Sequence, residues 1–225
     1  MSNAQKFLIF DAGPIISLTM NGLLNILEKL KQNFSGEFII TPDIKFEVID
    51  RPLKIKKYSF EALQVKNLLD KGILKLSSEF VKDSVLVKET QKILNISNSI
   101  LYADENIKLI QRGEASCLAF ANLCKKNNVI AIDERTTRMI SEAPDKLKQL
   151  MENKLHTKIN VNEQNLKLFG NFKFIRSTEL IYIAYKKNLF DLKKDKILLD
   201  ALLYAVKFKG VAVSSSEIEE IKKLA

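Results

Sequence analysis

The chain has few of the nitrogen and sulfur side chains from which many metal sites and nucleophilic active sites are built. One histidine and two cysteines occur among 225 residues, and tryptophan is absent. A single histidine excludes a zinc site built on several histidines. Cys117 and Cys124 stand in one helical segment at a spacing that fits neither a CxxC metal motif nor a disulfide framework, so we interpret both as small core residues. His156 lies in a polar stretch without a nucleophile motif, and we expect it on the solvated surface.

Nucleotide-binding and membrane motifs are also missing. Neither GxGxxG nor GxxxxGK[ST] occurs, so dinucleotide and P-loop binding lose their main support. No apolar run approaches the roughly 18 residues of a membrane span. Since no basic-then-apolar leader opens the sequence, we expect a cytoplasmic protein with no membrane partner. Carboxylates and lysine are plentiful instead, with 36 Lys and Arg against 27 Asp and Glu.

Apolar runs alternate with helical patterns along the first 145 residues, and this alternation predicts the fold class. It is typical of an α/β fold with three layers, in which helices cover a central parallel sheet of four to five strands. We predict a core over residues 5–145 and a mainly helical, basic C-terminal extension over 146–225 that packs on it. The expected strands are 6–10, 37–41, 73–76 and 129–133, and the expected helices are 23–34, 41–50, 59–72, 80–95, 98–110, 113–128, 177–188, 193–210 and 214–224.

Two of the expected strands end on an aspartate. Asp11 follows "FLIF" and Asp133 follows "VIAI". Ligands of open parallel sheets bind beyond the carboxyl ends of the strands, so the two carboxylates meet there if their strands are neighbours. A purely structural alternative exists, because Asp11 is also a suitable N-cap for the next helix, with Pro14 in its first turn.

Two further acids, Glu47 and Glu114, fall at helix positions that face the same end of the sheet. Glu114 has its own structural alternative, since an acid in a first helical turn favours the helix dipole. Glu47 has one as well, as a plain surface residue. Four carboxylates that converge without a cation raise one another's pKa, and a hard divalent ion such as Mg²⁺ relieves that repulsion.

These motifs carry a family resemblance. The order of "FLIFDAGPIISL", "TPDIKFEV", "GEASCLAFA" and "VIAIDERTTRMI" resembles the PIN domain family of metal-dependent nucleases, which includes VapC-type toxins, and is most similar to its archaeal and bacterial branch with a GEA motif. The resemblance implies a PIN-like fold and a Mg²⁺ or Mn²⁺ cofactor. It implies catalytic roles for Asp11, Glu47, Glu114 and Asp133, with Asp11, Glu114 and Asp133 as metal ligands and Glu134 as an accessory acid.

The sequence departs from the family pattern at one position beside the expected metal site. Many members carry Ser, Thr or Asn two residues after the first Asp, where this chain has Gly13. Ser17 is a candidate accessory residue in its place. Gly13 also argues against a phosphatase of the haloacid dehalogenase type, because that chemistry needs a second Asp at this position.

The resemblance implies a metal-dependent endoribonuclease, of the kind that serves as a toxin in toxin–antitoxin pairs. The partners it implies are RNA, an antitoxin protein and a second copy in a homodimer. The alternative is a PIN-fold module with weak or no catalysis that binds nucleic acid or protein.

The C-terminal part is the most basic region of the chain. Residues 146–225 hold 16 Lys and Arg against 9 Asp and Glu. We expect this segment to contact RNA phosphates, with Lys193, Lys194 and Lys196 as nucleic-acid-binding residues, because lysine suits sequence-independent attraction to the backbone. The alternative is an ordinary solvated lysine surface.

Overall fold

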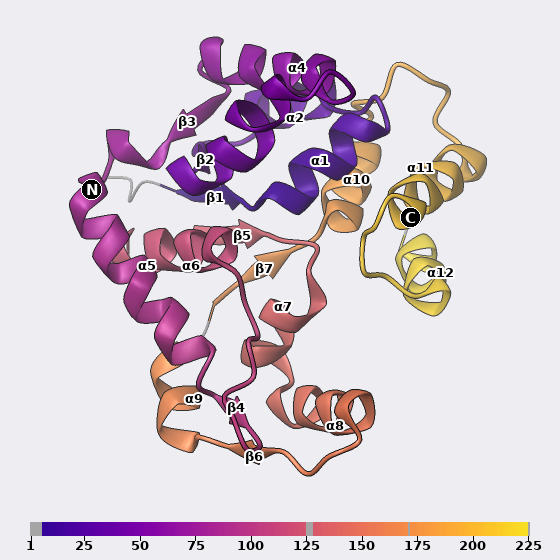
Figure 1. The fold of residues 1–225 in the computed structure, drawn as a ribbon. Helices are drawn as coiled ribbons and strands as arrows, with labels where there is room; N and C mark the ends of the chain where they lie inside the picture. Colours follow the sequence, from indigo (N-terminus) through magenta and orange to yellow (C-terminus); the bar gives the residue numbers. More distant parts are fainter. Residues whose placement is uncertain (1–5, 125–127, 171, 225) are drawn as a thin grey trace, which may run out of the picture.

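A parallel sheet forms the centre of the molecule (Figure 1). The computed structural model describes residues 6–124, 128–170 and 172–224. Within these residues, five strands pair in parallel in the order β3-β2-β1-β5-β7. Their bounds are Phe7–Phe10 (β1), Glu37–Ile40 (β2), Leu74–Leu76 (β3), Asn128–Ala131 (β5) and Phe174–Ile175 (β7). The predicted α/β class and the predicted sheet of four to five strands are confirmed.

Helices cover the sheet, as the all-apolar strands require. All four residues of β1 are buried. In Figure 1, α1 (Ala12–Met20), α2 (Asn25–Gln32) and α4 (Ser59–Asp70) lie together on one side of the strands, while α5 (Asp83–Ser97) and α6 (Arg112–Cys124) lie on the other. This arrangement is that of a three-layer α/β/α fold, and its PIN-like character stays a prediction.

Short elements between β2 and α4 give the chain a compact turn. Thr41 caps α3 (Pro42–Lys45), since its hydroxyl accepts a bond from the Ile44 N–H at 3.3 Å and Pro42 takes the first helical position. The helix continues as one π-helical turn, η1 (Phe46–Asp50), and as η2 (Pro52–Lys54). The helix predicted over 41–50 is therefore confirmed, with a widened second half.

The helix predicted over 98–110 is wrong. Asn98 ends α5, and the chain after it forms β4 (Leu101–Tyr102), which pairs with β6 (Asn160–Val161). The Asn98 side chain closes this loop: its Oδ1 accepts from the N–H groups of Leu109 at 2.7 Å and Ile110 at 2.9 Å. Side-chain bonds of asparagine to the backbone compete with helix formation, which is why the apolar spacing alone misled here.

The C-terminal part is more varied than predicted. The predicted helices there are confirmed as α10 (Ser177–Lys186), α11 (Lys196–Phe208) and α12 (Ser215–Lys223). Beyond Asp133 the chain also forms three helices that the sequence pattern did not predict, α7 (Arg135–Glu142), α8 (Pro144–Leu155) and α9 (Glu163–Phe169). The strand β7 lies beyond residue 145 yet pairs with β5, so the central sheet uses residues from both predicted parts. The domain boundary itself stays a prediction.

Several residue-level expectations can be compared with the structure. Cys117 is buried, as predicted, Cys124 is half-buried, and His156 is exposed. The helix predicted over 113–128 is confirmed to Cys124; residues 125–127 lie outside the described part, and Asn128 already belongs to β5. Among the described residues, none of the helices has the length and apolar character needed to cross a membrane.

Candidate functional site

Asp11 and Asp133 follow neighbouring strands. β1 and β5 pair directly, with Phe10 opposite Ala131, and the Asp11 N–H donates to the Ala131 carbonyl at 2.9 Å. Gly13 lies between the two side chains: a Cβ added to it would stand 3.6 Å from Asp11 Oδ2 and 3.6 Å from Asp133 Cβ. A side chain at position 13 would therefore contact both aspartates, and glycine brings no such group to this place.

Asp11 also caps a helix, as the structural alternative predicted. Its Oδ2 accepts a long bond of 3.4 Å from the Gly13 N–H at the start of α1. Burial, together with the charges of Glu114 and Glu47, raises the pKa of Asp11 from 3.8 to about 7, against the lowering effect of the Gly13 and Ala12 N–H groups. A cap alone does not explain three acids within electrostatic reach of one another.

Glu114 is a buried acid in the first turn of α6. Its Oε2 accepts from the Gln111 N–H, and its Oε1 accepts from the Thr137 hydroxyl at 3.1 Å. Burial raises the pKa of Glu114 to about 7 against the effect of these two bonds, and the charges of Glu134 and Glu47 add to the increase. The Glu114 carboxylate thus binds a backbone N–H at the start of α6 and lies within electrostatic reach of other acids.

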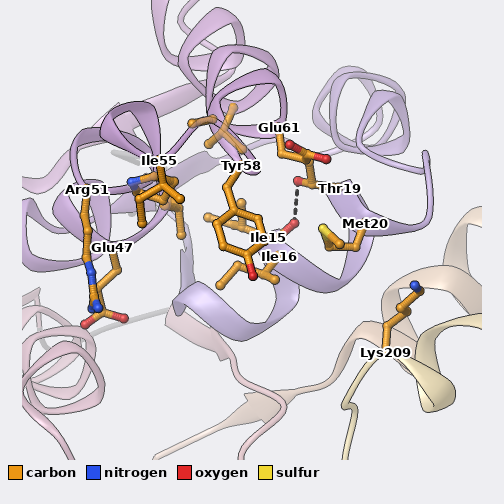
Figure 2. Close-up of a pocket in the computed structure, with 14 residues that line it drawn as sticks. Ile15, Ile16, Thr19, Met20, Glu47, Arg51, Ile55, Tyr58, Glu61 and Lys209 are labelled. Carbon is orange, nitrogen blue, oxygen red and sulfur yellow. Dashed lines mark hydrogen bonds between the residues drawn. The ribbon is translucent and has the colours of Figure 1, made fainter.

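Glu47 reaches the same place from η1. Its Oε1 lies 2.7 Å from the point where a Cβ on Gly113 would stand, beside the start of α6. Glu47 is exposed as a whole residue, yet its carboxylate is partly buried, and this burial raises its pKa. The Asp43 charge also raises the pKa, and the Arg51 charge lowers it. Figure 2 shows Glu47 and Arg51 side by side at one end of a pocket.

Two contacts between the start of α3 and α6, one buried and one on the surface, explain why Glu47 and Glu114 lie close to each other. The hydroxyls of Thr41 and Ser116 are 2.6 Å apart in the interior. Arg112 Nε donates to Asp43 Oδ1 at 2.8 Å on the surface above them. These contacts fix the η1 turn against the first turn of α6, where both acids are found.

Asp133, like Glu114, accepts a hydrogen bond at each of its oxygens, but both of its donors belong to one residue, Ser177. Its Oδ1 accepts from the Ser177 N–H at 2.8 Å, and its Oδ2 accepts from the Ser177 hydroxyl at 2.6 Å. Burial raises its pKa, and the Ser177 bonds work against that rise. Asp133 therefore anchors the start of α10 in addition to lying beside Gly13.

The accessory candidates have distinct environments. Glu134 is exposed and caps α7 by accepting from the Thr137 N–H at 2.8 Å, and its charge acts on Glu114. Ser17 is buried in α1, and its hydroxyl has no hydrogen-bond partner among the described residues. Within residues 6–124, 128–170 and 172–224, no three or more His, Cys, Asp or Glu side chains stand in metal-binding positions.

A basic pocket lies next to Asp133 and Glu134, and we name it the α7 pocket. It has a volume of about 550 Å³, and its charged lining residues are Arg135, Arg138, Lys146 and, from α12, the acid Glu217. The Arg138 Nε is buried and has no partner in the described part of the chain. Burial and the nearby Arg176 charge lower the pKa of Arg138, while the charges of Glu142, Glu179 and Glu217 oppose them.

Sequence reasoning did not find this pocket. The signal was present in "DERTTRMISEAPDK", where the three cations Arg135, Arg138 and Lys146 follow Asp133 closely in the sequence. Lys193, Lys194 and Lys196 instead lie around the connection between α10 and α11, all exposed. Lys194 donates to the Lys186 carbonyl at 3.1 Å and stands over the Tyr185 ring, and the role predicted for the three lysines stays a prediction.

No protein-family model, no curated protein and no solved structure matches this chain. The PIN resemblance therefore rests on the four short motifs and stays a prediction.

Proposed function

We propose that the protein is a Mg²⁺- or Mn²⁺-dependent ribonuclease that hydrolyses phosphodiester bonds at the carboxyl edge of its sheet. The observation that carries this proposal is the convergence of Asp11, Glu47 and Glu114 from three separate elements beyond β1. The charges that act most strongly on Asp11 and Glu114 are all negative. A buried acidic cluster of this kind costs stability unless a cation compensates it.

The donor set fits a hard divalent ion. All candidate ligands are carboxylate oxygens, which Mg²⁺ and Mn²⁺ prefer. Mg²⁺ commonly binds through one or two protein carboxylates and completes its shell with water and substrate phosphate, so a dedicated cage of three side chains is not required. When bound, such an ion activates water and stabilises the leaving oxygen of phosphodiester hydrolysis.

The residues take different roles in this proposal. Asp11 and Glu114 are the buried ligands, and their helix-cap bonds fix the direction of each carboxylate. Glu47 is the solvent-facing acid and is the one placed to accept a proton from water. Asp133 is held by two bonds from Ser177, so we assign it first to holding α10 beside the site, with the remaining lone pairs of its oxygens available to an ion.

One observation favours the alternative, a nucleic-acid-binding module without hydrolysis. Asp133 and Glu114 each accept hydrogen bonds from the protein at both oxygens, so two of the four acids are partly satisfied without a metal ion. Incubating purified protein with single-stranded RNA in Mg²⁺, in Mn²⁺ and in EDTA separates the two functions. Cleavage in either metal and none in EDTA supports the ribonuclease; binding without cleavage in all three supports the module.

Gly113 provides a test of Glu47 that leaves every acid in place. In Gly113→Ala the new methyl group would meet Glu47 Oε1 at 2.7 Å and Ile44 Cδ1 at 3.1 Å. The Glu47 end is flexible and will move away, so we expect the cleavage rate to fall about tenfold, or about 1.4 kcal/mol. Because alanine favours a helix over glycine, the free energy of unfolding should change by less than about 1 kcal/mol. An unchanged cleavage rate would remove Glu47 from the site.

The α7 pocket supports a polyanionic substrate, because it places Arg135, Arg138 and Lys146 beside the candidate site. Of these, Arg135 and Lys146 are exposed and form no ion pair with the described residues. Cations of this kind gain affinity for nucleic acid by releasing counterions from phosphates.

We predict that Arg135→Gln/Lys146→Gln lowers the salt dependence of RNA binding by about one unit of log–log slope per lost contact. Affinity should fall alike for all RNA sequences, since phosphate contacts carry no base information. Salt titrations of RNA binding in EDTA give the slopes. The triple variant Lys193→Ala/Lys194→Ala/Lys196→Ala, measured in parallel, tests the contacts predicted from the sequence. If the double and the triple variant both keep the slope of the parent, neither cluster of cations contacts the RNA.

A further inference from the structure

A second pocket adjoins the acidic cluster from the opposite side of Glu47. This pocket, which we name the Tyr58 pocket, has a volume of about 450 Å³ and opens between α1, the η1 turn and the start of α4 (Figure 2). Its walls are mainly apolar, and Ile16, Met20 and Tyr58 in them remain 47%, 39% and 38% exposed. Pockets of this size and character hold small planar ligands.

One polar group in the pocket has no partner. Glu61 Oε2 is buried without a hydrogen bond to any described residue. In Figure 2 the Glu61 side chain lies beside Thr19, whose hydroxyl is already used by the Ile15 carbonyl at 2.6 Å. A buried carboxylate oxygen without a donor is costly, so its place in this pocket points to a ligand that brings an N–H group.

The rim of the pocket carries three cations beside the acid Glu47. Arg51 and Lys209 line it, and Lys57 Nζ stands 5.2 Å from the centre of the Tyr58 ring. Arg51 and Lys57 belong to the exposed stretch "RPLKIKKYS", which has four cations and no acid. A cationic rim around an apolar, aromatic floor is the pattern by which proteins hold single-stranded nucleic acid.

Glu47 connects this pocket to the candidate site. It lines the Tyr58 pocket, and its charge raises the pKa of both Asp11 and Glu114. A nucleotide whose phosphate lies at the acidic cluster therefore has this pocket within reach of its base.

We propose that the Tyr58 pocket binds one unpaired base of the RNA next to the cleaved linkage and selects bases with an exocyclic amino group. This inference rests on the proposed ribonuclease function. Tyr58 stacks on the base, and Glu61 accepts its amino hydrogen. Guanine is the best match, because its N1–H and N2–H donors lie side by side and fit the two oxygens of one carboxylate. Uracil lacks an amino group, and its one base N–H, at N3, lies between two carbonyl oxygens that repel a carboxylate, so uracil is disfavoured.

The test is equilibrium binding in EDTA, where cleavage does not occur, with fluorescently labelled uridine octamers that carry one central guanosine, cytidine, adenosine or uridine. We expect the parent protein to bind the guanosine octamer at least about fivefold more tightly than the all-uridine octamer. Glu61→Gln should abolish that preference. Tyr58→Ala should weaken binding of all four octamers about tenfold, and Tyr58→Phe should bind like the parent.

Phe60→Ala is the matched control, because Phe60 is 67% exposed on the same helix and does not line the pocket. Equal binding of all four octamers by the parent, or equal effects of Tyr58→Ala and Phe60→Ala, would overturn the inference. A change of molecular mass in solution on Tyr58→Ala, with RNA binding unchanged, would also overturn it and make the pocket a protein interface. A base preference that depends on Glu61 in a protein that never cleaves RNA would refute the ribonuclease and keep the pocket.

Discussion

Asp11→Asn and Glu114→Gln are each expected to lower metal-dependent RNA cleavage at least about 100-fold, or about 2.7 kcal/mol of transition-state stabilisation. The amide keeps the size of each side chain and can still accept the cap bonds from Gly13 and Gln111. It lacks the negative charge that holds a divalent ion. The measurement is the initial cleavage rate of labelled single-stranded RNA in Mg²⁺ and in Mn²⁺.

Asp104→Asn is the matched control for this result, because Asp104 is an exposed acid in a loop without an ion pair to the described residues. It should cleave at the parental rate. If Asp11→Asn cleaves as fast as Asp104→Asn, the activity either belongs to a contaminant or uses another site.

The second large effect is expected in the stability of the metal-free protein. The folded-state pKa values of Asp11 and Glu114 are raised to about 7 from 3.8 and 4.5. The folded protein therefore binds protons more tightly at these groups than the unfolded chain does. Their favourable contribution is complete below about pH 4 and is lost as the pH rises through about 7. A variant that lacks one of these two carboxylates should therefore lose less stability as the pH rises.

We expect Asp11→Asn in EDTA to be more stable than the parent at pH 8, by on the order of 2 kcal/mol. The difference should shrink toward pH 5, where the parent carboxyl is already protonated. Urea unfolding at pH 5 and pH 8 measures it. Mg²⁺ should stabilise the parent at pH 8 and leave the variant unchanged, since only the parent binds the ion. A parent that is more stable than Asp11→Asn at pH 8 in EDTA would contradict a self-repelling cluster.

The sequence was sufficient for the fold class and for the main acids. Short apolar runs predicted four of the strands, because a strand that is buried on both faces consists almost entirely of apolar residues. The two aspartates could be placed at one edge because parallel strands end there together. The fifth strand, Phe174–Ile175, has only two residues and follows a polar stretch, so no periodic pattern predicts it.

What the sequence could not supply were contacts between distant segments. Ser177 binds both oxygens of Asp133, although 44 positions separate the two residues. Glu61 looks like an ordinary helix acid in the sequence, and only the packing of α4 on α1 shows that one of its oxygens is buried without a partner. The cations of the α7 pocket come from the consecutive helices α7 and α8, but the pocket is completed only by the segment 212–214 and Glu217 of α12, far along the chain.

The most direct test of the central claim, that the acids beyond β1 bind a divalent ion, is anomalous X-ray scattering from crystals soaked in Mn²⁺. We predict a peak at about 2.1–2.2 Å from carboxylate oxygens of Asp11 and Glu114, with Glu47 bound directly or through a water molecule. The peak should be missing from crystals of Asp11→Asn treated in the same way. Parent crystals with no peak at these carboxylates at saturating Mn²⁺ would contradict the account.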